Sequence, residues 1–138
     1  MNSIQTNAAS LAGRILVALI FVTSGYGKIG GFSATAAYMA SKGMPIAEVL
    51  LVGAIVIELL GGIMLIAGWK TRWAAAALIV FLIPATLIFH GTAGLDAQAA
   101  RGQMIHFMKN LSIAGAMLLL IAFGPGAWSV DGRKRRAA

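Results

Sequence analysis

The stretch from Ile55 to Arg72 is largely apolar and carries one acidic residue, Glu58, which lies near the middle of a longer apolar run from Ile46 to Trp69. At about 1.5 Å per residue, this run is long enough to cross a hydrocarbon core of about 30 Å as an α-helix. On such a helix Glu58 shares a face with Gly61 and Gly68, which indicates contact with another helix. A carboxylate in the membrane interior is costly unless it is paired, neutral or hydrated, so Glu58 requires a partner or a function.

Four apolar runs account for most of the chain, at about residues 11–30, 46–69, 73–90 and 105–123. The 138 residues are 59% hydrophobic and 11% charged, whereas soluble domains have about 25% charged residues. We therefore expect one all-α domain over residues 1–138, an integral membrane bundle of four transmembrane helices with a basic tail at 129–138.

The connection between the first two spans predicts a short interfacial helix. Ser33 is its expected N-cap and Gly43 its expected C-cap. Phe32 and Met39 lie on an apolar edge and Lys42 on a polar one, so the helix should lie along the membrane surface. It is either a lid over the bundle or an ordinary ordered loop.

The basic residues are distributed unevenly over the predicted topology. The N-terminus, the turn at 69–72 and the C-terminus share one side and carry seven of the 11 Lys and Arg residues, against four on the other side. This asymmetry predicts that both termini are cytoplasmic. The net charge of +7 belongs to this pattern, and no fold or aromatic platform supports nucleic-acid binding. The absence of cysteine excludes disulfides, thiolate metal sites and iron–sulfur clusters.

The first span carries two cations, Arg14 and Lys28, that both lie at or inside the membrane boundaries. With Ala18, Phe21 and Gly25 they follow steps of three and four, which places them on one helical face. The small residues on that face indicate a helix contact, so we expect both cations to point into the bundle. The alternative is that they snorkel to the interfaces, where Arg14 would act as a topology signal or a contact for lipid phosphate.

The groups that could neutralise Glu58 come from the other spans. Lys28, His90, Lys109 and Asn110 lie toward the outer half of the predicted bundle, which Glu58 reaches from the middle. We predict a polar site there, with Glu58, Lys109 and Lys28 as candidate catalytic residues and His90, Asn110, Lys28 and Lys109 as candidate cofactor contacts. A quinone suits this site because its carbonyls accept hydrogen bonds and a carboxylate can transfer protons. The alternative is a fixed ion pair that sets helix register.

His90 and His106 raise the question of a metal or haem site, because neutral imidazole is a common ligand. Both lie at the outer ends of adjoining predicted helices. Asp96 is the one further ligand nearby, and a bis-histidine haem needs ligands at matching depth in the bundle. We predict no metal site, and neither haem nor metal is the expected cofactor.

Several short motifs occur in an order and spacing typical of one family. They are Arg14 with Ser24 to Lys28, Ile57 to Gly62, Gly68 to Arg72, Phe89 with His90, Phe107 to Leu111, and Gly124 to Asp131. On these motifs, over about residues 14–131, the chain resembles the DoxX family of small four-helix proteins of the bacterial inner membrane. It is closest to members described as quinol-oxidase-like.

The resemblance implies a location in the bacterial inner membrane and a link to quinone-dependent respiratory or oxidative-stress enzymes. The leading interpretation is a membrane subunit of, or partner to, a quinone-linked oxidoreductase, whether a membrane or a soluble one. A non-enzymatic scaffold or assembly factor is the second interpretation. A small-molecule carrier is the third, and with four spans and no visible inverted repeat it would require a homo-oligomer.

Overall fold

The computed structural model describes residues 3–137, with side chains from residue 3 to residue 133. It consists of helices: α1 (Ser3–Gly30), α2 (Phe32–Ser41), α3 (Ala47–Ala67), α4 (Thr71–Phe89), α5 (Ala97–Phe123) and α6 (Val130–Ala137). No strand occurs in this range. Of the predicted basic tail, the side chains of Lys134, Arg135 and Arg136 lie outside the description.

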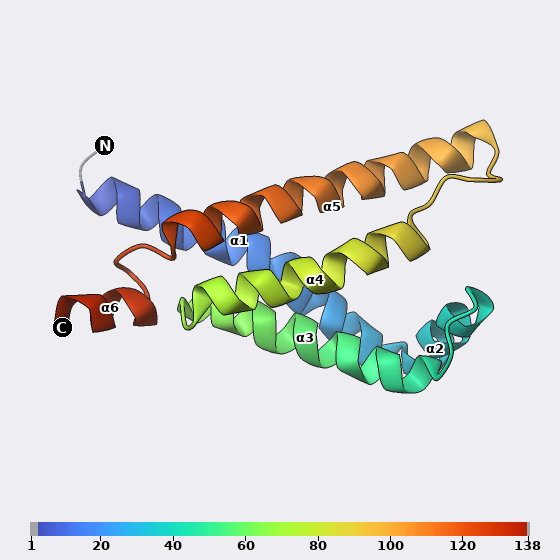
Figure 1. Cartoon of the computed structure of the whole chain (residues 1–138), viewed down its shortest axis with the longest axis horizontal. Helices are drawn as coiled ribbons and strands as arrows, with labels where there is room; N and C mark the ends of the chain where they lie inside the picture. The colour runs from blue at the N-terminus through green and yellow to red at the C-terminus, as the bar shows by residue number, and fades with distance from the viewer. Residues whose placement is uncertain (1–2, 138) are drawn as a thin grey trace.

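Four of the described helices, α1, α3, α4 and α5, are long and apolar enough to cross a membrane. In space α3 packs against both α1 and α4, and α4 packs against α5 (Figure 1). Side chains from all four, including Ala18, Leu65, Leu78 and Met117, form a common core. The predicted all-α, four-span architecture is confirmed.

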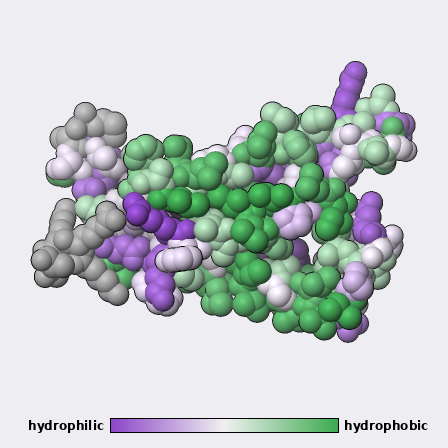
Figure 2. All heavy atoms as spheres, in the orientation of Figure 1, coloured by the Kyte–Doolittle hydropathy of each residue, from purple (hydrophilic) through white to green (hydrophobic). Residues whose placement is uncertain are grey.

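The outer surface of the bundle is apolar. Phe123, Val80 and Leu16 are 79%, 71% and 69% exposed, which suits contact with lipid chains and not with water. Hydrophobic side chains cover most of the middle of the face in Figure 2, and hydrophilic ones gather mainly toward its two ends. This distribution is what a bilayer-embedded bundle requires.

Two spanning helices are longer than predicted. Helix α5 begins at Ala97 instead of residue 105, because the Asp96 side chain caps it by accepting hydrogen bonds from the Gln98 and Ala99 amides, both at 2.9 Å. Helix α1 begins at Ser3 instead of residue 11. Its extra turns contact the C-terminal segment, as Ser10 Oγ donates to Pro125 O at 2.8 Å.

The predicted interfacial helix is present as α2, but Ser33 is not its N-cap. The cap position is Gly31, which has no side chain to cap the helix. The helix ends with Lys42 as C-cap, followed by Gly43 at φ +78°, a conformation that glycine adopts without strain. Met39 packs against Leu51 of α3, and Phe89 at the end of α4 joins the same cluster. This helix therefore covers one end of the bundle.

The interface between α1 and α3 is a close one, and glycine makes it possible. A Cβ atom on Gly62 would lie 2.6 Å from Val22 Cγ2 and 3.4 Å from Ala18 O. Valine is stiff in a helix and cannot move aside cheaply. The predicted small-residue stripe on the second span is therefore a packing surface, with Glu58, Gly61 and Leu65 buried along it.

Arg14 closes this interface at the end of the bundle where α3 finishes. Its side chain is 1% exposed, and Nη1 donates to Leu65 O at 3.0 Å and Ile66 O at 2.9 Å. Nη2 donates to Trp128 O in the segment after α5. The last carbonyls of a helix lack partners within it, and a guanidinium supplies both hydrogen bonds and opposite charge. Arg14 thus points into the bundle as predicted, and the snorkelling alternative is wrong for this residue.

The C-terminal segment is held at the same place. The Asp131 carboxylate accepts from Lys70 N and Thr71 N, both at 2.9 Å, and so caps the start of α4. Asp131 N in turn donates to Gly68 O at 2.9 Å. The turn between α3 and α4 is therefore joined to the C-terminal segment, and α6 lies beside this turn in Figure 1.

We predict that Arg14→Met destabilises the protein by about 3 kcal/mol, because α3 loses bonds to a charged donor and its carbonyls stay buried. Unfolding in mild detergent measures the loss. The matched control is Arg72→Met, since Arg72 makes one exposed bond, to Ala122 O at 3.2 Å, and its loss should cost less than about 1 kcal/mol. Equal losses in the two variants would contradict the assigned role of Arg14.

A second prediction concerns the glycine contact. Gly62→Ala should destabilise the bundle by about 1–2 kcal/mol, because the new methyl group forces α1 away from α3. In the same helix a Cβ on Gly53 meets nothing within 4 Å, so Gly53→Ala should be neutral or stabilising through helix propensity. Thermal denaturation of both variants in detergent tests the difference, and a neutral Gly62→Ala would show that the interface has room to spare.

Candidate functional site

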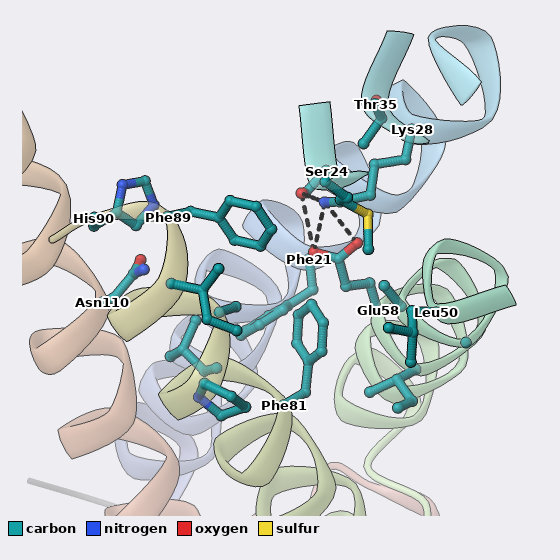
Figure 3. Close-up of a pocket in the computed structure, with 18 of the residues that line it drawn as sticks. Phe21, Ser24, Lys28, Thr35, Leu50, Glu58, Phe81, Phe89, His90 and Asn110 are labelled. Carbon is teal, nitrogen blue, oxygen red and sulfur yellow. Dashed lines mark hydrogen bonds and ion pairs between the residues drawn. The ribbon is translucent and has the colours of Figure 1, made fainter. Parts of the chain in front are cut away.

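A cavity of about 680 Å³ lies in the half of the bundle covered by α2. All four spanning helices and α2 contribute to its lining, which is mostly apolar and includes the aromatic rings of Phe21, Phe81 and Phe89 (Figure 3). The volume falls within the range of about 300–1,000 Å³ that is usual for small-molecule sites. Its polar side chains form separate groups on opposite walls.

The first wall carries Glu58 of α3 with Lys28 and Ser24 of α1. Lys28 Nζ lies 3.0 Å from Glu58 Oε1 and 2.9 Å from Oε2. Ser24 Oγ donates to Glu58 Oε1 at 3.0 Å and accepts from Lys28 Nζ at 2.6 Å. We call these three residues the Glu58 triad. It contains an ion pair between Lys28 and Glu58.

Hydrogen bonds within the triad join Lys28, Ser24 and one oxygen of Glu58, Oε1. The other oxygen, Oε2, lies 2.9 Å from the Lys28 ammonium as an ion-pair contact, but it is buried and accepts no hydrogen bond from the described residues. Glu58 is buried, with 5% of its side chain exposed, whereas 24% of the Lys28 side chain is exposed. A paired and hydrogen-bonded carboxylate is the arrangement that a low-dielectric interior tolerates.

The local sequence explains how α1 and α3 bring these groups together. Ser24 and Lys28 are four residues apart and therefore lie on one face of α1. Gly25 lies between them on the buried side, where a Cβ atom would approach Leu59 Cγ to 2.9 Å and Glu58 Cβ to 3.3 Å. The missing side chain of Gly25 lets α3 approach closely enough for Glu58 to reach Lys28.

On the opposite wall, Asn110 of α5 is buried and bound to α4. Its Nδ2 donates to Thr86 Oγ1 at 2.9 Å, and Thr86 Oγ1 donates to Leu82 O at 2.7 Å. In a helix the Leu82 carbonyl is also the usual acceptor for the amide of residue 86. The chain of bonds from Asn110 through Thr86 ends at this carbonyl, so it joins α5 to the backbone of α4. One of the two amide hydrogens of Asn110 is used here, and an amide carries two.

His90, at the end of α4, and Lys109 of α5 form the rim of that wall. His90 Nδ1 lies 2.8 Å from Gln103 Oε1, and the His90 ring stacks on that of His106 with centroids 5.1 Å apart. Lys109 Nζ lies 3.4 Å from His106 Nδ1 and is exposed. These contacts hold the outer part of α5 against the end of α4.

The structure therefore brings the five predicted site residues to one cavity, though not into one cluster. Glu58, Lys28, His90, Lys109 and Asn110 all line it. Only Lys28 contacts Glu58, whereas the contacts recorded for Lys109 and Asn110 are to His106 and Thr86. The expectation that the fourth span helps to neutralise Glu58 is wrong, because α3 packs between α1 and α4 and α5 lies on the far side of α4.

Sequence reasoning missed the polar side chains of Ser24 and Thr35, which line the cavity, and that of Thr86, which bonds to the lining residue Asn110. The signal for Ser24 was its position one helical turn before Lys28, on the same face. Thr86 gave no signal of its own, because its bond to Asn110 depends on how α4 packs against α5.

The two histidines do not converge on a common point with other ligands. Their rings lie nearly parallel, at 20° to each other. In the part of the chain that the structure describes, no group of three or more His, Cys, Asp or Glu side chains could hold a metal ion.

Comparison with known proteins identifies the family. The DoxX family model matches residues 9–91. Inner membrane protein YphA of Escherichia coli is 41% identical over 123 residues, which are 89% of this chain and 88% of that protein. Inner membrane protein YqjF of the same organism is 39% identical over 121 residues, 88% of each chain. No solved structure matches the chain.

Both relatives align with nearly nine tenths of the chain. Their names place both relatives in the inner membrane, in agreement with the four apolar spanning helices found here. The chain therefore belongs to the DoxX family and is an integral, multi-pass protein of the inner membrane.

Proposed function

We propose that this protein is a quinone-binding membrane subunit of, or partner to, an oxidoreductase. The observation that carries the proposal is the cavity, which combines apolar and aromatic walls with polar groups on two opposite sides. A quinone ring is planar and apolar and has carbonyl oxygens at opposite ends, so it matches this division. Its isoprenoid tail would extend along the exposed apolar helices into lipid.

Each polar group has a distinct task in this proposal. Lys28 contacts both oxygens of Glu58, so one of these contacts can be given up to a ligand carbonyl while the ion pair persists. On the other wall Lys109 and the second amide hydrogen of Asn110 can donate to the other carbonyl. His90 stands at the rim, where its second ring nitrogen can exchange protons.

Reduction of a bound quinone to quinol takes up two electrons and two protons. The chain has no cysteine and therefore no thiol couple of its own, so the electrons come from the cofactor of the partner oxidoreductase. Glu58 and His90 are the groups placed to hold and transfer protons near the two ring oxygens.

The ion pair of the triad also favours a second candidate, a scaffold without chemistry. A carboxylate that is paired with Lys28 and hydrogen-bonded to Ser24 can act as a lock between α1 and α3. The two candidates predict different effects of replacing the lock by neutral groups. A scaffold would keep its function, because it needs only the helix register, whereas a quinone site would lose its ligand.

For orientation, we propose that both termini are cytoplasmic. The end that contains them and the α3–α4 turn carries seven of the 11 basic residues. Arg14 is occupied inside the bundle, and without it this end still has the larger share.

Reporter fusions test this orientation. A fluorescent protein fused after the C-terminus should fluoresce in cells, and alkaline phosphatase at the same point should be inactive. Alkaline phosphatase inserted at Gly94, between α4 and α5, should be active. The reverse pattern would overturn the proposed orientation and the assignment of the cavity to the outer half of the membrane.

The quinone site is tested by purification in mild detergent and extraction of bound quinone. We predict that Glu58→Gln lowers the quinone content by about tenfold, because the ammonium loses the anion that orients it toward the ligand. The control is Glu48→Gln, which changes an exposed acid in the first turn of the same helix and should leave the quinone content as in the wild type.

A double variant separates the ligand site from the lock. Lys28→Gln with Glu58→Gln leaves no unpaired charge, so it should recover most of the stability lost in Glu58→Gln alone. We expect it to remain without quinone. A double variant that retains the wild-type quinone content, or a wild-type protein that neither carries nor binds quinone, would refute the proposed function in favour of the scaffold.

A further inference from the structure

The charges that line the cavity do not balance. Lys28 and Glu58 neutralise each other within the triad, whereas Lys109 on the opposite wall has no carboxylate within ion-pair distance among the described residues. The contact recorded for its ammonium is His106 Nδ1 at 3.4 Å. With neutral histidines, the lining therefore carries one excess positive charge.

No other acid at this end of the bundle compensates that charge. Asp96 is occupied as the cap of α5, bound to the Gln98 and Ala99 amides. Glu48 is exposed in the first turn of α3, and neither of these acids lines the cavity. The remaining charged side chains near this end, Lys42 and Arg101, are basic and exposed.

Position makes this excess charge relevant to a ligand. Lys109 lies near the middle of the spanning helix α5, one residue before the buried Asn110, and its exposed side chain stands at the rim of a mostly apolar cavity. A cation in such a place gains from an anionic partner, and a hydrogen bond between two charged groups is about twice as strong as a neutral one.

We propose that the cavity selects a ring ligand that carries a negative charge, and that Lys109 is the residue that receives this charge. The ligand class is a quinone with an ionised ring hydroxyl. This inference rests on the proposed function and adds to it the charge state of the ring and the wall toward which the charged oxygen points. Asn110, beside Lys109, donates to the same oxygen or its neighbour.

A pair of matched probes tests the inference. At neutral pH, 2-hydroxy-1,4-naphthoquinone is an anion and 2-methyl-1,4-naphthoquinone is neutral, and the two rings have nearly the same size. Isothermal titration of the detergent-purified protein should show tighter binding of the anion by about threefold to tenfold. Lys109→Gln keeps a hydrogen-bond donor and removes the charge, so it should abolish this preference.

The matched control is Arg101→Gln, which removes a positive charge from the same helix at an exposed residue that does not line the cavity. It should keep the wild-type preference, because the charge it removes faces water and is screened. A preference that falls equally in both variants would overturn the inference, since it would reflect the general charge of the surface.

The remaining outcomes distinguish the inference from the proposed function. If both probes bind equally well to the wild type, the charge selection is refuted and the quinone site stands. If neither probe binds, the proposed function fails and the inference fails with it. Displacement of the ring by dodecanoate at equal concentration would overturn the inference in favour of an acidic lipid as the ligand.

Discussion

The interface between α1 and α3 is the contact on which the rest of this structure depends. The two helices run antiparallel and are joined by polar contacts at both ends, Arg14 with the last carbonyls of α3 and Lys28 with Glu58. Between these points Gly62 permits close packing against Ala18. Lipid chains provide no hydrophobic driving force between helices, so the register of two spans must come from close packing and polar bonds. Two separated polar contacts on one face leave a single register that satisfies both.

This register determines the character of the cavity. Because Lys28 and Glu58 pair within the α1–α3 contact, their charges on the first wall cancel. The second wall is built from α4 and α5, where Asn110 is bound to Thr86 and, among the described residues, no carboxylate lies within ion-pair distance of Lys109. The two walls therefore differ in kind. One holds the helices in place, and the other offers unsatisfied charge and hydrogen-bonding capacity to a ligand.

The opposite end of the bundle is closed by a different set of bonds. Asp131 caps α4, and Arg14 reaches the carbonyl of Trp128 in the segment that leads to α6. Gly68, at φ +67°, leaves room for this segment, since a Cβ there would clash with Ser129 Cβ of the segment and with Arg14 Nη1. The cavity therefore lies toward the end of the bundle opposite to these contacts.

The sequence by itself determined the class of the fold, the face of each of the first two spans that meets protein, and five of the polar residues that line the cavity. Apolar length and helical periodicity carry that information, because the membrane requires every backbone group to be bonded within a helix. The first residue of a helix was harder to predict from the sequence. Helix α5 begins at Ala97 among polar residues, and its cap, Asp96, resembled part of a loop. Only the tertiary structure decided which polar groups meet. In the sequence, Lys28, Lys109 and Asn110 were equivalent candidates for the partner of Glu58. Because α3 packs between α1 and α4, of these three only Lys28 contacts Glu58.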